Sequence, residues 1–149
     1  MPRRYDQACP VAKSLELVGE RWTLLIVRDL LGGQRRFQDL QRSLAGIAPN
    51  ILSERLKLME EHGLIRRSFY SDHPPRAAYE LTDKGRELGV VVGALAAWGS
   101  RHLHRGTTLV HDACGHAVKL GYFCPDCGTR IRGATVRLAR TGVRTGVRL

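Results

Sequence analysis

The chain of 149 residues has no long hydrophobic run. Its longest weakly polar stretch, LGVVVGALAAWG from Leu88, is shorter than the roughly 20 residues that a membrane-spanning helix needs. The first ten residues, MPRRYDQACP, carry charge but precede no apolar segment of the kind that directs export. These absences predict a cytoplasmic protein with no membrane-embedded part, where thiols stay reduced. The four cysteines then favour metal binding or redox chemistry over structural disulfides.

Acidic residues are also scarce: 14 Asp and Glu stand against 24 Lys and Arg, a net charge of +10. The last eighteen residues, 132–149, hold five arginines and no acid. A basic chain suits a polyanionic partner, either nucleic acid or a membrane surface, although a merely soluble basic protein has the same composition. The tail has no aromatic anchor, so disorder is one expectation for it. As an arm it either contacts phosphates or is simply solvated.

Short helical patterns fill the first part of the chain. Apolar residues at helical spacing predict helices over 11–18, 21–31, 35–44 and 48–61. Glycines follow the first, second and fourth of them, as they usually do at helix ends. The second segment, RWTLLIVRDLL, is apolar nearly all round and predicts a buried helix.

The fourth pattern, from Ala48 to Glu61, has two faces. Leu52, Leu56 and Met59 form an apolar stripe, whereas a second stripe at i, i+3, i+4 and i+7 is polar and consists of Asn50, Ser53, Glu54 and Lys57. Such a polar stripe is usually just a solvated face. Two short helices joined by a glycine-containing turn, however, make a helix-turn-helix, whose second helix enters the major groove of DNA.

Two short strand-like runs follow, LIRRSFY from Leu64 and RAAYELT from Arg76. The segment SDHPP between them predicts a turn, because proline is excluded from the middle of a strand. A hairpin directly after a helix-turn-helix is a wing, and arginine near its tip suits phosphate contact or insertion into a narrow minor groove. The alternative is an ordinary surface loop.

A further helix is predicted from Thr82, a suitable N-cap, through TDKGRELGVVVGALAAWGSRHL. Its broad apolar face comprises Leu88, Val91, Val92, Leu95 and Trp98. Three short helices and a wing are too small to cover this whole face, so a partner subunit is the economical candidate.

From Cys9 to Trp98 the sequence resembles the HxlR-type winged helix-turn-helix transcription regulators of bacteria. The motifs that carry the resemblance are CPV, RWTLLI, RRFQDL, LSERLKLMEEHGLI, PPR and YELTDKG, in that order. The resemblance implies a MarR-like fold, mainly α with a small β-hairpin wing, and a homodimer that binds a double-stranded DNA operator. It also implies dimerisation through the first and last helices, a reading helix over 48–61 and a wing over 65–81. The candidate DNA-contacting residues are Arg36, Asn50, Ser53, Arg55, Lys57, His73 and Arg76.

Cys9 corresponds to the N-terminal cysteine of that family, which in some members is a thiol switch for electrophiles or oxidants. Sensing requires an accessible thiolate, which Lys13, Arg3, Arg4 and the start of the first helix would stabilise. Alternatively, Cys9 is a small packed hydrophobe. A disulfide between subunits would join two copies of Cys9 or recruit a thiol from the C-terminal segment.

The C-terminal segment contains two copies of one pattern, HDACG from His111 and CPDCG from Cys124: a ligand, two residues, Cys and Gly. Two such knuckles supply four ligands for a tetrahedral, structural Zn²⁺ site made of His111, Cys114, Cys124 and Cys127. His111 is favoured over His116 because it occupies the place of the first cysteine in the other copy. Incidental thiols in a loop and a redox-active CxxC remain alternatives.

The sequence thus predicts a winged helix-turn-helix domain over 1–105, a zinc-ribbon-like knuckle hairpin over 106–131 and a basic tail over 132–149. The function favoured is DNA-binding transcriptional regulation, with no effector indicated. One alternative is an enzyme that uses the Cys/His cluster, but paired carboxylates, a nucleophile elbow and a phosphate loop are absent. The other is an RNA-binding zinc-ribbon protein. Such a protein would need exposed aromatic residues, but all aromatic residues together make up 6% of this chain.

Overall fold

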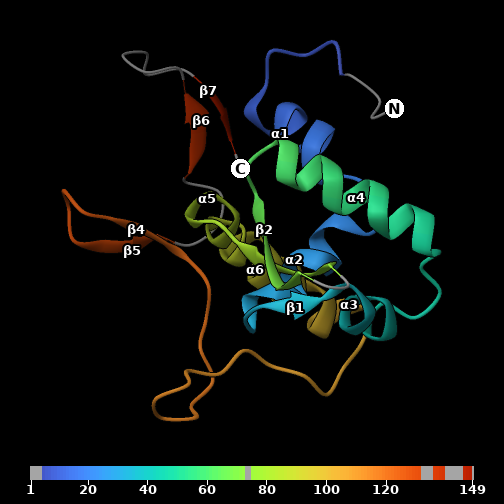
Figure 1. Cartoon of the computed structure of the whole chain (residues 1–149). Helices are drawn as coiled ribbons and strands as arrows, with labels where there is room; N and C mark the ends of the chain where they lie inside the picture. Colours follow the sequence, from blue (N-terminus) through green and yellow to red (C-terminus); the bar gives the residue numbers. More distant parts are fainter. Residues whose placement is uncertain (1–4, 73–74, 132–135, 140–145, 149) are drawn as a thin grey trace. The chain divides into compact units, whose positions relative to one another are not determined.

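The computed structural model describes residues 5–72, 75–131, 136–139 and 146–148, and the chain folds as two compact units, residues 1–92 and 93–149. The first unit contains α1 (Pro10–Val18), α2 (Thr23–Leu31), β1 (Arg35–Arg36), α3 (Phe37–Ser43), α4 (Pro49–Glu61), β2 (Ile65–Asp72), β3 (Pro75–Leu81) and α5 (Asp83–Glu87) (Figure 1). The division falls inside α6 (Gly89–His102), whereas the predicted boundary at residue 105 follows the end of that helix.

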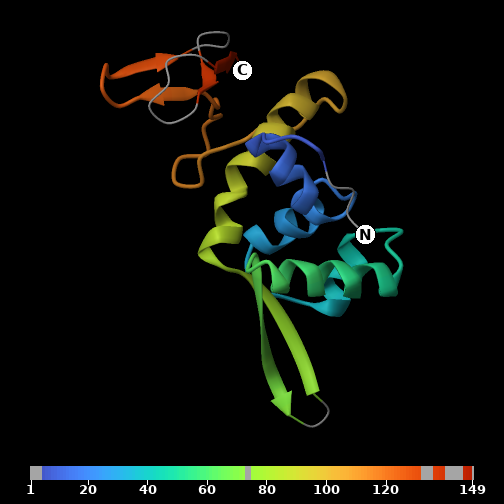
Figure 2. The ribbon, with the colours of Figure 1, turned by 90° about the horizontal axis from the view of Figure 1, so that it is seen from above.

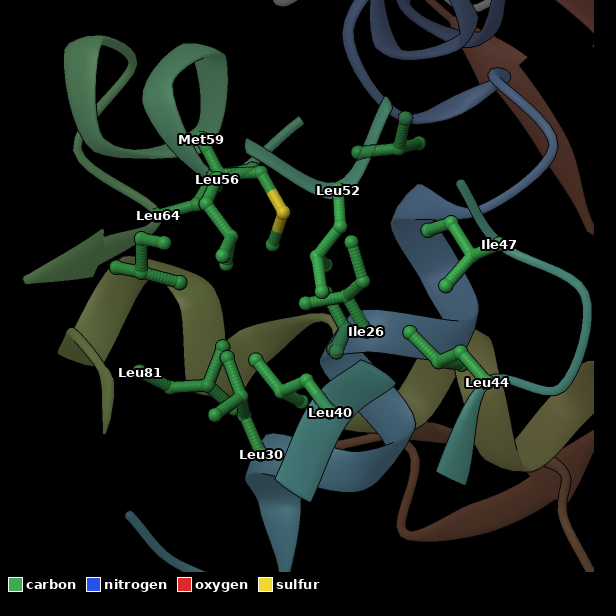
Figure 3. Close-up of a cluster of buried hydrophobic side chains, with 13 residues drawn as sticks. Ile26, Leu30, Leu40, Leu44, Ile47, Leu52, Leu56, Met59, Leu64 and Leu81 are labelled. Carbon is green, nitrogen blue, oxygen red and sulfur yellow. The ribbon is translucent and has the colours of Figure 1, made fainter. Parts of the chain in front are cut away.

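The first unit has one hydrophobic core, to which α2, α3, α4 and the ends of the wing strands all contribute (Figure 3). The apolar stripe predicted for α4 is confirmed, since Leu52, Leu56 and Met59 are all buried. The prediction that α2 is a buried helix holds for one side of it only. Its Leu25 and Leu31 are each 37% exposed, because the unit packs against only one side of the helix.

The end of α4 is a Schellman motif. Gly63 has a φ of +68°, its amide donates to the Glu60 carbonyl (2.9 Å), and the Leu64 amide donates to the Met59 carbonyl (2.8 Å). Leu64 and Met59 belong to the same buried cluster, which is the apolar contact that accompanies this motif. Glycine is required at position 63 because an L side chain is strained at that φ. The motif turns the chain directly from the helix into β2.

The wing is a long hairpin that projects beyond the helices of the first unit (Figure 2). Strands β2 and β3 pair antiparallel from Ile65↔Leu81 to Asp72↔Pro75, with an irregularity between Phe69 and Ser71. The predicted turn over 71–75 is shorter than expected, because Pro75 begins β3, a position where a strand tolerates proline.

A third strand, β1, was not predicted, and the helix expected from Arg35 begins at Phe37 instead. Arg35 and Arg36 pair with Tyr79 and Ala78 of β3, so that the sheet has the order β1-β3-β2. The single helix predicted after Thr82 is likewise two helices, α5 and α6. The break lies at Leu88, whose amide donates to the Gly85 carbonyl at the end of α5 and whose carbonyl accepts from Val92 in α6.

After α6, the described residues of the second unit form short hairpins. Strand β4 (Tyr122–Cys124) pairs with β5 (Thr129–Ile131), and β6 (Arg137–Ala139) pairs with β7 (Gly146–Arg148). Residues 137–139 and 146–148 of the basic tail are therefore paired rather than irregular, and residues 132–135, 140–145 and 149 of the tail lie outside the described residues. In the part of the chain that the structure describes, no helix is long and apolar enough to cross a membrane.

We predict that Gly63→Ala lowers the free energy of unfolding by about 1–2 kcal/mol, because alanine is strained in the left-handed conformation. Urea unfolding followed by circular dichroism measures the change. Gly99→Ala is the matched control: Gly99 lies within helical α6 with open space around its Cα, so alanine there is not expected to destabilise the chain. Equal stability of Gly63→Ala and the unchanged chain would show that the helix end is not held in this conformation.

Candidate nucleic-acid interface

The outer face of α4 is polar and exposed. Asn50, Ser53, Glu54 and Lys57 are all exposed, on the side opposite the three buried apolar residues. The helix begins without a side-chain cap at Ala48, with Pro49 in its first turn. Pro49 fits there because its fixed φ suits the start of a helix, where its missing amide hydrogen costs nothing. The predicted orientation of the stripe is therefore confirmed, and its N-terminal half presents short hydrogen-bonding side chains.

Arg55 lies differently from the rest of the predicted set. Its side chain is only 12% exposed, and its guanidinium lies 3.4 Å from Glu54 and 3.9 Å from Glu20. In this structure Arg55 is an ion-pair residue at the edge of the core.

Lys57 remains available on the surface. Its ammonium lies 3.8 Å from Glu61 one turn away, and the two side chains are 77% and 53% exposed. An exposed pair of this kind contributes at most about 1 kcal/mol, so exchanging Glu61 for a phosphate oxygen costs little.

The C-terminal end of α4 borders a hollow of roughly 470 Å³ between the helix and the wing, lined by Ser53, Leu56, Lys57, Glu60, Glu61, Arg67 and Tyr79. Arg67 lies with its Nε 3.8 Å from Glu60 and its guanidinium 5.2 Å from the Phe69 ring centre. The pKa of Tyr79 is raised by burial, which the charge of Arg67 partly offsets. The two carboxylates at this end of α4 are each paired with a cation, Glu60 with Arg67 and Glu61 with Lys57, which offsets their repulsion of phosphate.

The wing carries a second ion pair. Arg66 and Glu80 face each other on paired strands, and the Arg66 Nε donates to the Glu80 carboxylate at 2.8 Å. This hydrogen bond lowers the pKa of Glu80 and raises that of Arg66. Nearer the tip, Arg76 is exposed on β3. The remaining wing candidate, His73, lies outside the described residues.

Arg36 is exposed on β1, immediately before α3. Its amide donates to the Asp39 carboxylate (3.2 Å), which fixes the start of α3. Arg36, Lys57 and Arg76 therefore come from three different elements of the first unit.

Cys9 is the N-cap residue of α1 and is partly exposed. Its carbonyl accepts the Lys13 amide at 3.0 Å, while the Lys13 ammonium pairs with Glu16 at 2.8 Å. The other two cations predicted to stabilise its thiolate, Arg3 and Arg4, lie outside the described residues.

The predicted metal ligands lie in two pairs. His111 Nδ1 is 3.2 Å from Cys114 Sγ, and the side chains of Cys124 and Cys127 are hydrogen-bonded to each other. The pKa of the Cys127 thiol is lowered, mainly by a hydrogen bond with the Thr129 side chain and then by Cys124. Across the described residues, no three or more His, Cys, Asp or Glu side chains gather closely enough to hold a metal ion.

Residues 17–107 match the model of the HxlR-like helix-turn-helix family. The chain belongs to this family. Among curated proteins, the HTH-type transcriptional regulator Rv3095 of Mycobacterium tuberculosis is 42% identical over 130 residues, which cover 85% of this chain and 82% of Rv3095. This HxlR-like chain is therefore a transcriptional regulator of the helix-turn-helix class.

Two solved structures extend the comparison. PA1607 is 34% identical with a TM-score of 0.77, and the match covers 91% of this chain and 96% of PA1607. The similarity to PA1607 thus extends beyond the family match into the C-terminal segment. The oxidised form of the redox regulator HypR is 29% identical with a TM-score of 0.60, and covers 66% of this chain and all of HypR.

Sequence reasoning missed two features of this surface. The first is the acidic end of α4, although the four-residue spacing of Lys57 and Glu61 signals the pair. The second is the pairing of Arg66 with Glu80, which is readable only once the register of the hairpin is fixed.

We predict that Glu80 titrates below its ordinary pKa near 4.5 because of the Arg66 hydrogen bond. Any stability that it contributes is present above the unfolded-state pKa and is lost as the pH falls through the lower folded-state pKa. Carboxyl chemical shifts in an NMR pH titration measure this value. Arg66→Gln should return it toward the ordinary value, whereas Arg67→Gln on the other face of β2 should leave it unchanged. If Arg66→Gln leaves the pKa of Glu80 unchanged, the pairing of the two residues is refuted.

Proposed function

We propose that this HxlR-like regulator is a homodimer that binds double-stranded DNA sequence-specifically, with α4 in the major groove and the wing against the backbone. The observation that carries the proposal is the two-sided α4: three buried apolar residues anchor it while Asn50, Ser53 and Lys57 stand exposed on the opposite face. Asparagine and serine hydrogen-bond base edges, and lysine contacts phosphate or guanine. The N-terminal part of a recognition helix is also the part that usually reads bases.

Arg76 and Arg36 extend this surface. Arg76 is exposed near the tip of the wing, and a cation there suits contact with the sugar-phosphate backbone or a narrow minor groove. Arg36 lies beside the start of α3 and adds a second cation from another element. The net charge of +10 supplies the long-range attraction that steers such a protein to DNA.

Two helices support the homodimer. In α6 no residue is buried, and Leu95 and Trp98 are 52% and 50% exposed. In α1 the apolar side chains of Val11 and Leu15 are also exposed. A second copy that covers these apolar helices removes them from water, and a two-fold axis matches a palindromic operator with half-sites about one helical turn apart.

We expect Lys57→Gln and Arg76→Gln each to weaken operator binding and to reduce the slope of log K against log salt by about one, the value of one lost phosphate contact. The operator sequence is first identified by selecting bound duplexes from a random pool. Fluorescence anisotropy over a salt series then measures the slope. Arg66→Gln is the matched control in the same hairpin, since Glu80 already holds that guanidinium. A protein that stays monomeric, or that prefers no duplex over random sequence, contradicts the proposal.

The similarity to the redox regulator HypR favours a second proposal, that Cys9 makes DNA binding responsive to thiol chemistry. Cys9 is partly exposed at the start of a nine-residue helix, so a reagent in solvent can reach its sulfur. The Cys9 thiol adds across the activated C=C double bond of an electrophile: its sulfur bonds to one carbon and its proton ends on the other, which places a bulky group at the beginning of α1.

Cys9→Ser should abolish the change in DNA affinity that N-ethylmaleimide causes, while basal affinity stays within about twofold. Mass spectrometry identifies the modified cysteine, and anisotropy measures the affinity. The triple variant Cys114→Ser, Cys124→Ser, Cys127→Ser, in which Cys9 is the one remaining cysteine, should keep the response. A response that persists in Cys9→Ser and disappears in the triple variant would assign sensing to the C-terminal thiols.

A further inference from the structure

The two hairpins of the C-terminal segment have the same layout. In the first, the His111 amide donates to the His116 carbonyl at 2.9 Å and Val110 pairs with Ala117. In the second, Cys124 pairs with Thr129 and Phe123 with Arg130. Positions 111 and 124 therefore correspond, and so do 116 and 129. Sequence spacing suggested this equivalence, and the backbone pairing supports it independently.

The turns of the two hairpins also correspond. Each places a cysteine three residues after its first ligand, and a glycine with positive φ comes next: Gly115 at +70° and Gly128 at +64°. In the first hairpin the amides of both Cys114 and Gly115 donate to the His111 carbonyl, at 3.2 and 2.7 Å. This closed turn brings the second ligand back beside the first.

The side chains within each pair lie at a distance that suits a shared metal. With Zn–S of about 2.3 Å and Zn–N of about 2.0 Å, the nitrogen and sulfur at two corners of a tetrahedron stand about 3.5 Å apart. His111 Nδ1 and Cys114 Sγ are 3.2 Å apart, and the side chains of Cys124 and Cys127 are hydrogen-bonded to each other. His116 corresponds to Thr129 instead, which lies on the strand opposite the first ligand of its hairpin.

The segment has no core of its own. No residue of 101–131 is buried, and apolar side chains such as Val110, Tyr122 and Phe123 are at least half exposed. Isolated hairpins are marginal in water, and segments this small are usually stabilised by disulfides or metals. A Cys124–Cys127 disulfide would leave the hairpins unconnected, whereas a metal uses both pairs.

We propose that one Zn²⁺ per chain joins the two hairpins through His111, Cys114, Cys124 and Cys127. On binding, the three thiols lose their protons to solvent and neutral His111 supplies a nitrogen lone pair, so the ion fills a closed, four-coordinate structural site. Because the structure brings the ligands together as pairs and not as a set of four, metal binding draws one hairpin onto the other. Most of the stability of the segment then comes from the metal.

Metal analysis of the full-length protein, purified under reducing conditions without chelator, should give one zinc per chain. Substitution with Co²⁺ should give the visible absorption of a tetrahedral thiolate site. His111→Ala and Cys124→Ser should lose the metal, while the matched controls His116→Ala and Cys9→Ser keep it. Absence of zinc overturns the proposal. Half a zinc per chain overturns the single-chain site, and metal loss in His116→Ala but not in His111→Ala overturns the ligand assignment.

Hydrogen exchange separates this site from the proposed DNA-binding function. Removing zinc with a chelator should speed amide exchange over residues 109–131 at least tenfold and leave α2 and α4 unchanged. Operator affinity should stay within about threefold, because the proposed DNA contacts lie in the first unit. Unchanged exchange over 109–131 after complete zinc removal would overturn the role of the metal, whatever the affinity for DNA.

Discussion

The arrangement of the first unit depends on the junction where α4 ends. The carbonyls of three consecutive residues at the end of α4, His62, Gly63 and Leu64, have no hydrogen-bond partner within the helix. Thr82 and Lys84, which follow the wing, donate hydrogen bonds to all three. The Lys84 ammonium donates to the His62 carbonyl (2.8 Å), the Thr82 hydroxyl to that of Gly63 (2.6 Å), and the Thr82 amide to that of Leu64 (3.0 Å). Unpaired backbone groups at a helix end are costly when shielded from water, so this junction fixes where the chain leaves α4 and where it returns. It therefore sets the direction of the wing relative to the helix.

The close fit at this junction explains a glycine that the sequence alone leaves unexplained. A Cβ on Gly85 would lie 2.0 Å from the Leu64 carbonyl oxygen, so α5 approaches the end of α4 more closely than any side chain permits. The Thr82 hydroxyl also accepts the Gly85 amide at 3.1 Å, and one side chain thus caps α5 while it satisfies the end of α4. The helix α4, the wing and α5 are held together by one small set of hydrogen bonds to the backbone. The spacing between α4 and the wing is therefore a property of the fold.

Local signals in the sequence predict most of the first unit. The periodicity of Leu52, Leu56 and Met59 identifies the buried face of α4, and Gly63 marks its end. The errors come from pairing between distant residues. Arg35 and Arg36 form a strand only because β3 lies beside them, so periodicity alone assigns them to a helix. Arg55 pairs with its sequence neighbour Glu54 and also with the distant Glu20, and the second of these partners is not visible in a window of local sequence.

We infer that the two units are stabilised by different physical means. The first buries a continuous set of aliphatic side chains, whereas no residue between 101 and 131 is buried and the ligand pattern there predicts a metal. Hydrophobic burial can be read from the spacing of apolar residues, whereas in the proposed zinc site the relation between the two hairpins depends on which ligands the ion binds. Polar ligand pairs held by short turns fold locally, as the backbone pairing of each hairpin shows. Joining them needs an interaction between hairpins that the apolar side chains of the segment, all at least partly exposed, do not supply.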